Sequence, residues 1–415
     1  MHAPLYKTVA DDLAGAIRDG VYAPGDRLPS VRQLIQDRGI SGTTASQALR
    51  ELESRQLAVS RPRSGYFACD DWKKTRLKAP KQRPHLSAQD VTVGDLVVRI
   101  LNDSYEQGTI NLGTAIPDDS LLPTAALNRQ INKLDHNRIN RYVFGNGLEE
   151  LRIQLCRQML NRGVQVSPDD ILVTAGCYDA VFQALQECCN PGDTVAVESP
   201  TFFLILQGMQ ALGLKVLEIP VDPETGVSLD ALEFALDNHD IKAVMLTPTF
   251  CNPIGCALTP EKKKRLVELI TDHGVPLIED DVYGDIYHEG SRPVSCKSFD
   301  TTGLVIYCAS FSKTIGPGFR IGWIIAGSYH ESILRRRVIS GLCGYALGQL
   351  VIASYLSEGK YDRHLRRLRA ACADQVMRMR AAVASRFPEG TRVSRPQGGF
   401  VLWVELPKQA SALKL

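Results

Sequence analysis

The stretch CASFSKTIGPGFRIGW, Cys308–Trp323, decides the fold prediction for most of this chain. A single lysine, Lys313, stands among small residues, after an apolar run and before a Gly-Pro-Gly turn. Two hydroxyl residues, Ser310 and Ser312, precede it, and Arg320 follows it by seven residues. The question is which other segments would surround this amine in the folded chain.

Apolar, β-rich runs of the kind buried in a parallel sheet recur along the large part of the chain. They cover 170–176, 193–199, 215–221, 241–248, 275–281 and 303–312, the last of which leads into Lys313. Helical stretches at 177–189 and 259–274 lie between them. This alternation predicts an α/β fold with a doubly wound, mainly parallel sheet and a site at the carboxyl ends of its strands.

Residues with suitable chemistry follow these runs, where such a site would form. Gly176 and Cys177 open a helix whose free backbone N–H groups favour a phosphate, although glycine is common at helix starts. Phe202 could stack on a flat ring or belong to the core, and Asn252 lies in an Asn-Pro-x-Gly turn. Asp280 ends a buried run, where a carboxylate is costly unless it meets a cation.

Together these residue types are the parts of a pyridoxal phosphate site. A lysine amine forms a Schiff base with the aldehyde, and an acidic residue pairs with the pyridine nitrogen. A helix start, two hydroxyls and an arginine suit the phosphate dianion. The order Thr-x-Gly, Pro-x-aromatic, Asn-Pro-x-Gly, Asp-x-x-Tyr, Ser-x-Ser-Lys, Arg-x-Gly resembles the fold-type-I, class I/II aminotransferases from about residue 100 onward.

The resemblance implies a role for each matching residue. Lys313 would be the Schiff-base lysine, and Asp280 would face the pyridine nitrogen. Asn252 and Tyr283 would hold the phenolate oxygen, and Phe202 would stack on the ring. Lys313, Asp280 and Tyr283 are the catalytic candidates. The phosphate would be bound by Gly176, Cys177, Ser310, Ser312 and Arg320.

Three further segments resemble parts of the same family. RYVFGNGLEELR, 141–152, resembles the segment whose tyrosine, here Tyr142, reaches the partner subunit's phosphate, so a homodimer is implied. NLGTAIPDDSLLP, 111–123, resembles the substrate-side loop and suggests Gly113 near the ligand. RPQGGFVLWVELP, 395–407, resembles the start of the small C-terminal domain, from which relatives supply an arginine for the substrate carboxylate. Because the sequence stops at Leu415, we expect this domain to be incomplete, with either another cation at the site or a shortened chain.

Short helical patterns fill the first seventy residues instead. Apolar residues at 5, 9, 13 and 17 predict a helix that ends at Gly20. A Pro-Gly turn then leads to Ser30, the N-cap of a second helix over 31–38. A third helix has residues 45, 48, 49 and 52 facing inward, and AVSRPRSGYFA, 58–68, predicts two short strands around a basic tip. This is the pattern of a winged helix-turn-helix, although other small three-helix domains share it.

In a winged helix-turn-helix the third helix enters the major groove, and the wing contacts the backbone or the minor groove. The outward residues here are Thr43, Thr44, Gln47 and Arg50 on the helix, with Arg61 and Arg63 on the wing. Residues 5–68 resemble the GntR-type DNA-binding domain, which implies binding to double-stranded operator DNA as a dimer. The positions that match the family are Arg32, Thr43, Thr44 and Arg63. Gly42 and Ser46 stand where the family often has base-reading arginines, so its usual operator sequence does not follow.

Composition and charge limit the remaining classes. The 415 residues are 44% hydrophobic and 23% charged, with neither a membrane-spanning run nor a secretory signal. Eleven scattered cysteines without zinc-site spacing predict reduced thiols in a cytoplasm, and no metal. The net charge is only +2, yet residues 50–83 hold ten basic against four acidic residues.

We expect a DNA-binding domain at 1–69, a basic linker at 70–90 and a pyridoxal-phosphate-binding domain at 91–415. The arginine-rich helix at 361–380 is either a solvated face or a second DNA-contacting surface. The combination has the layout of the MocR-type regulators. That resemblance implies a transcription regulator whose DNA affinity responds to pyridoxal phosphate, or to an amino acid or amine effector that reacts with it. The alternatives are an active aminotransferase with an accessory DNA-binding domain, and a DNA-binding protein whose large domain only dimerises.

Overall fold

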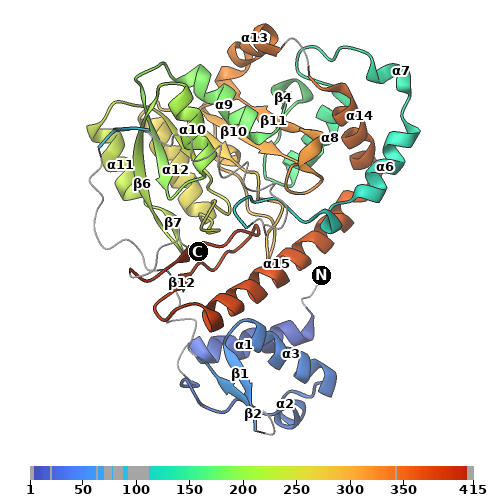
Figure 1. Ribbon diagram of the computed structural model, residues 1–415, viewed down its shortest axis with the longest axis vertical. Coiled ribbons are helices and arrows are strands. Elements are labelled where there is room, and N and C mark those ends of the chain that lie inside the picture. The colour runs from blue at the N-terminus through green and yellow to red at the C-terminus, as the bar shows by residue number, and fades with distance from the viewer. Residues whose placement is uncertain are drawn as a thin grey trace. The chain divides into compact units, whose positions relative to one another are not determined.

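Figure 1 shows the computed structural model, which describes residues 4–18, 21–61, 64–69, 77, 87–91, 112–341 and 344–408. The chain divides into two compact units. One comprises Met1–Leu77, Asp374–Ser394 and Leu402–Leu415, and the other comprises Lys78–Ala373 and Arg395–Val401. The domain boundaries expected at residues 69 and 90 stay predictions.

Three helices and a two-stranded sheet form the N-terminal domain. They are α1 (Leu5–Arg18), α2 (Val31–Arg38), α3 (Gly42–Ser54), β1 (Ala58–Arg61) and β2 (Gly65–Ala68). The two strands pair antiparallel, as a wing requires. The predicted N-terminal helix-turn-helix with a small sheet is therefore confirmed.

Local sequence explains these helix limits. Ser30 caps α2 in a capping box with Gln33, and Gly39 ends that helix in the left-handed conformation, with φ of 62°. The inward residues predicted for α3 are all buried. Leu5 is the exception to the predicted core of α1, since its side chain is 57% exposed. It is the first residue of the helix and lies beyond the edge of the core, while Gly20 lies outside the described residues.

A nine-stranded sheet forms the centre of the second unit. Its strands are β3 (Gln89–Asp90), β4 (Ile171–Thr174), β5 (Thr194–Ser199), β6 (Lys215–Asp222), β7 (Gly226–Val227), β8 (Ile241–Leu246), β9 (Leu277–Asp280), β10 (Val305–Ser310) and β11 (Gly322–Ile325). The order is β3-β6-β5-β8-β9-β10-β11-β4, with β7 beside β6. The pairs from β6 to β10 are parallel, and the pairs that involve β3, β7 and β11 are antiparallel. The mainly parallel sheet is confirmed, and each of the six predicted runs contains a strand.

Helices cover both faces of this sheet (Figure 1). The described α-helices after residue 112 are α6 (Thr124–Lys133), α7 (His136–Ile139), α8 (Glu149–Leu160), α9 (Cys177–Cys188), α10 (Phe203–Ala211), α11 (Leu229–Asn238), α12 (Pro260–Asp272), α13 (His330–Gly341), α14 (Ala346–Ser357) and α15 (Tyr361–Arg386). Along β5, Ala196 joins the core beneath α11 and α12, while Val195 and Val197 join the core beneath α9 and α10. Burial on both faces is why the strand sequences are apolar throughout rather than alternating.

The last elements are a two-stranded antiparallel pair, β12 (Arg392–Val393) with β13 (Val404–Glu405). Within the described ranges, every helix is either too short or too polar to cross a membrane.

Candidate functional site

The predicted site residues follow the carboxyl ends of neighbouring parallel strands. Phe202 comes after β5, Asn252 after β8 and Lys313 after β10, while Asp280 is the last residue of β9. These four strands are adjacent in the sheet and pair in parallel, so their ends lie along one edge. The sheet thus brings to one edge residues that are far apart in the sequence.

Lys313 is half-buried on the turn that follows β10. Its Nζ donates to the backbone oxygen of Ala115 at 2.5 Å and lies 6.0 Å from the centre of the Tyr283 ring. Burial lowers the pKa of this amine, and the carboxylate of Asp280 partly opposes the shift. A lowered pKa increases the neutral fraction of the amine, which is the nucleophilic form. Sequence reasoning missed Ala115, because a backbone carbonyl partner leaves no signal in the sequence.

Asp280 has a carboxyl group that burial makes less acidic. Burial raises its pKa to about 6, although hydrogen bonds from the Cys177 thiol and the Val282 N–H lower it in part. Those donors lie 3.2 and 3.0 Å from Oδ1. The charge of Lys313 also lowers the pKa of Asp280, although no ion pair to Asp280 forms among the described residues. A cationic group is therefore the partner that would best stabilise this carboxylate.

Gly176 and Arg320 lie close together where α9 begins. Gly176 is the N-cap of α9 with φ of 101°, and a Cβ there would lie 2.7 Å from Nη2 of Arg320. Glycine thus allows the guanidinium to reach the helix start, where Arg320 donates to the backbone oxygen of Ala175. Ser310 pairs with Gly322, which itself touches Gly176.

The remaining residues predicted to bind the phosphate are Ser310, Ser312 and Cys177. The hydroxyl of Ser310 accepts a hydrogen bond from the backbone N–H of Ser312 at 3.3 Å, so both serines belong to the same turn. The thiol of Cys177 points instead to Asp280. In this structure, Cys177 could therefore reach an anion through its backbone N–H but not through its side chain.

Tyr283, Asn252 and Phe202 differ in how closely they approach Lys313. Tyr283 is buried beside it, and burial raises the pKa of its phenol. Asn252 and Phe202 are half-buried, and the Phe202 ring packs on Phe203 at 5.0 Å between centroids. Their roles on a ring stay predictions.

Tyr142, expected to reach the partner subunit, and Gly113, expected near the ligand, both lie on the protein surface. Tyr142 is 69% exposed and its ring lies 5.3 Å from that of Phe144. Gly113 is exposed, two residues before the Ala115 carbonyl that accepts from Lys313.

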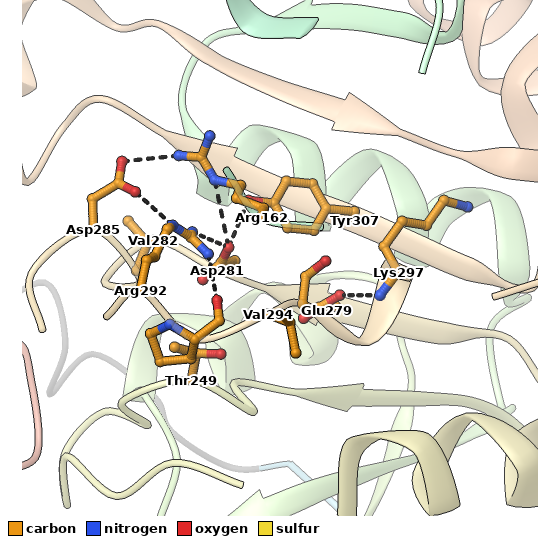
Figure 2. A network of polar contacts seen from close by, with 12 residues as sticks. Arg162, Thr249, Glu279, Asp281, Val282, Asp285, Arg292, Val294, Lys297 and Tyr307 are labelled. Atoms are coloured by element: carbon orange, nitrogen blue, oxygen red, sulfur yellow. Dashed lines mark hydrogen bonds and ion pairs between the residues drawn. The ribbon is translucent and has the colours of Figure 1, made fainter. Parts of the chain in front are cut away.

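A buried network of charges, which sequence reasoning missed, supports the segment from Asp280 to Tyr283 (Figure 2). Arg292 donates to Asp281 at 2.5 Å and to Asp285 at 2.6 Å, and Arg162 donates to Asp285 at 2.9 Å. The Tyr307 hydroxyl donates to Asp281 at 2.6 Å. Burial alone would raise the pKa of Asp285, but the two arginines lower it to about 2. Because Asp281 and Asp285 flank Tyr283 and Asp281 follows Asp280, the network fixes the backbone that presents both site residues.

Most of the predicted DNA-contacting residues that the structure describes are exposed. Thr43, Gln47 and Arg50 are exposed on α3, and Arg32 is exposed on α2. Thr44 is half-buried, with its hydroxyl 2.8 Å from that of Ser41, the N-cap of α3.

On the wing, the Arg61 guanidinium lies 4.3 Å from the centre of the Phe67 ring. Arg63 lies outside the described residues. In the part of the chain that the structure describes, no cluster of three or more His, Cys, Asp or Glu side chains could hold a metal ion.

Comparisons with known proteins agree with both halves of this architecture. Residues 5–67 match the model of the bacterial regulatory proteins of the gntR family. Residues 107–415 match the model of aminotransferase class I and II.

The similar proteins include regulators and an enzyme. The HTH-type transcriptional regulator YjiR of Escherichia coli (strain K12) is 37% identical over 97% of this chain and 86% of its own length. The regulator YdcR of the same organism is 36% identical over 99% of this chain and 88% of its own length. The Pyrococcus horikoshii kynurenine aminotransferase is 28% identical with a TM-score of 0.72, over 78% of this chain and 82% of that one. The chain therefore belongs to the MocR-type transcriptional regulators, in which a GntR-family DNA-binding domain is joined to a class I and II aminotransferase domain.

Proposed function

We propose that this regulator binds pyridoxal phosphate at Lys313, and that the cofactor, or an amino acid or amine that reacts with it there, changes the affinity of the protein for double-stranded operator DNA. The observation that carries the proposal is the presence of two complementary groups, an amine and a carboxyl, at the ends of adjacent strands. Lys313 offers an amine of lowered pKa, and Asp280 offers a carboxyl that has no ion-pair partner among the described residues.

The chain's own residues fit the three polar parts of this cofactor. Lys313 can hold the aldehyde end, and Asp280 can hold a proton on the pyridine nitrogen, which would in turn stabilise the buried carboxylate. Arg320 and the start of α9 can bind the phosphate, because the guanidinium and the helix N–H groups converge at Gly176. Ser310 and Ser312 could add hydroxyl groups, since Ser310 ends β10 and Ser312 belongs to the turn that follows it. When bound, pyridoxal phosphate supplies an aldehyde and an electron-withdrawing ring.

Regulation requires that the bound group distinguish two states of the protein. A ligand changes DNA affinity only if it binds the DNA-competent and the incompetent states unequally, and the coupling is then reciprocal. Tyr142 and Phe144, both strongly exposed aromatics, support a homodimer in which each site receives residues from the partner subunit.

An aminotransferase is the second candidate. It is favoured by the retention of Lys313, Asp280 and Arg320 at one sheet edge and by the 28% identity to a kynurenine aminotransferase. Steady turnover of an amino acid with a 2-oxo acid would support it.

The experiment that tests the proposed cofactor site is a loading assay. Addition of pyridoxal phosphate to the purified protein should produce a visible absorption band, and borohydride treatment should fix the cofactor on the peptide that contains Lys313. Lys313→Ala should abolish both signals, whereas Lys242→Ala, on an exposed lysine paired with Asp240, should change neither. A wild-type protein with no band, or with the cofactor fixed on another lysine, would contradict the proposal.

A further inference from the structure

Two buried side chains at the start of α15 hold the turn that carries Lys313. The hydroxyl oxygen of Tyr361 lies 2.9 Å from Oγ1 of Thr314, and Nε2 of His364 lies 2.6 Å from the backbone oxygen of Thr314. Thr314, Tyr361 and His364 are 1%, 2% and 7% exposed, respectively. Since Thr314 directly follows Lys313, these contacts set where the lysine backbone lies.

The direction of each hydrogen bond can be assigned from its acceptor. Tyr361 has one hydroxyl proton, and Asp285, 3.2 Å away, can only accept because its pKa of about 2 keeps it ionised. Tyr361 therefore donates to Asp285 and accepts from the Thr314 hydroxyl. The backbone oxygen of Thr314 also only accepts, so Nε2 of His364 carries the proton there.

Tyr361 thus links the Lys313 turn to the buried charge network. On one side is the Lys313 turn, and on the other is the Asp285 end of the buried network. Residues 361 and 364 are three apart in a helix, so they lie on one face. Their ring centroids are 6.4 Å apart at an interplanar angle of 30°, and the Tyr361 ring also packs edge-on to Phe311.

The other end of Lys313 is held as well. Its Nζ donates to the backbone oxygen of Ala115. A group that bonds to Nζ must replace this contact, while the contacts of Thr314 with α15 remain. Binding at Lys313 therefore changes the contacts at one end of a turn whose other end is hydrogen-bonded to α15. α15 continues without a break to Arg386, and the division between the two compact units falls within it, between Ala373 and Asp374.

We propose that Tyr361 and His364 are positioning residues for Lys313, and that through them a group bound at Lys313 acts on α15 and so on DNA affinity. This inference rests on the proposed function and names the route of its regulation. A packed helix is a suitable element for such coupling, because it moves as a body rather than deforming locally.

The test uses full-length protein and two measurements. The first is the dissociation constant of pyridoxal phosphate, from its visible band. The second is the ratio of DNA dissociation constants between fully loaded and cofactor-free protein. Tyr361→Phe keeps the ring and removes the hydroxyl. It should weaken cofactor binding about five- to tenfold, since a buried hydrogen bond is lost, and should bring the DNA ratio toward one.

Matched variants separate positioning from general stability. Tyr355→Phe removes a hydroxyl from a buried tyrosine whose ring lies 6.4 Å from that of Tyr361, and both measurements should stay at their wild-type values. His364→Leu should resemble Tyr361→Phe, and His364→Gln, which retains a donor, should come back to within about threefold of wild type. Thr314→Val removes the same hydrogen bond from its other end and serves if Tyr361→Phe does not fold.

The outcomes distinguish this inference from the proposed function. If wild-type protein shows no band or no cofactor-dependent DNA ratio, the proposed function fails and this inference fails with it. If wild type shows both but Tyr361→Phe matches Tyr355→Phe, the inference alone is overturned. A Tyr361→Phe protein that binds the cofactor weakly yet keeps the wild-type DNA ratio would also overturn it, because α15 would then not carry the signal.

Discussion

The exposed face of α3 and the edge of the large sheet at Lys313 are built in opposite ways. On α3, Gln47 and Arg50 are exposed, and the residues that hold the helix in place lie on its other face. At the sheet edge, Asp280 and Lys313 are half-buried, and each depends on a partner from a distant segment. A change on α3 should therefore alter binding and leave folding intact, whereas a change at the sheet edge should alter both.

The largest effect is expected inside the buried network. Asp285→Asn removes one of the two carboxylates that neutralise Arg162 and Arg292, so that only Asp281 remains beside them, and the free energy of unfolding should fall by about 3–5 kcal/mol. Asp12→Asn removes an ion pair with Arg38 on the surface of the N-terminal domain and should cost less than about 1 kcal/mol. Urea unfolding at pH 7 measures both. Equal losses for the two variants would remove the contrast between the two regions.

The same network should make the free energy of unfolding depend on pH. Asp285 has a pKa of about 2, below the ordinary value of 3.8. Its contribution is therefore present above about pH 4 and is lost as the pH falls toward 2. Urea unfolding across this pH range should show that Asp285→Asn flattens the acid side of the stability curve.

On α3 we expect a substitution to change DNA binding alone. Arg50→Ala should weaken operator binding about 10- to 100-fold, with cofactor loading and unfolding unchanged, because its guanidinium is exposed. Anisotropy at a fixed salt concentration is the measurement. Arg363→Ala, on the exposed side of α15, is the matched control and should have little effect. A tenfold loss for Arg363→Ala would instead identify α15 as a second DNA-contacting surface.

At Asp280, stability and cofactor binding should change in opposite directions. Its pKa of about 6 in the cofactor-free chain lies above the ordinary 3.8, so its burial lowers stability as the pH rises from about 4 to 6. Asp280→Asn should remove this fall and raise the free energy of unfolding at pH 7 by about 1–3 kcal/mol. Pyridoxal phosphate should bind it at least tenfold more weakly. A less stable Asp280→Asn protein would show that another group already compensates this carboxylate.

The smallest effect is expected at Cys177. Its thiol is a weak donor, so Cys177→Ala should raise the pKa of Asp280 slightly and weaken cofactor binding only a few-fold. Cys177→Ser retains a donor and should bind as the wild type does. Cofactor titrations of the two variants check this. If Cys177→Ala bound normally, the contact would have no influence on the site.

The sequence predicted the exposed face of α3 and the half-buried sheet edge to different extents. Periodicity places the α3 residues, because an amphipathic helix shows its buried face in the spacing of its apolar residues. It failed at Leu5, where the apolar pattern runs past the end of the core. The apolar runs predicted six strands, but not the short β7 or the antiparallel β11, whose four residues Gly-Trp-Ile-Ile follow the turn that carries Lys313.

At the sheet edge, motif order could predict which residues gather but not what holds them. Asp280 ends β9 and Lys313 follows the adjacent β10, as expected. Their partners could not be found in this way, since Ala115 acts through its backbone and Cys177 acts across 103 positions of sequence. Arg162 and Arg292 carry no motif, and only the fold pairs them with Asp285.

The most direct test of the proposed regulation is a fluorescence anisotropy titration of the DNA immediately upstream of this protein's own coding region. Cofactor-free and pyridoxal-phosphate-loaded protein are compared at one fixed salt concentration, with Lys313→Ala in both conditions. We expect loading to change the DNA dissociation constant of the wild type at least fivefold and to leave that of Lys313→Ala unchanged. Identical wild-type affinities with and without the cofactor, despite full loading at Lys313, would contradict the proposed regulation.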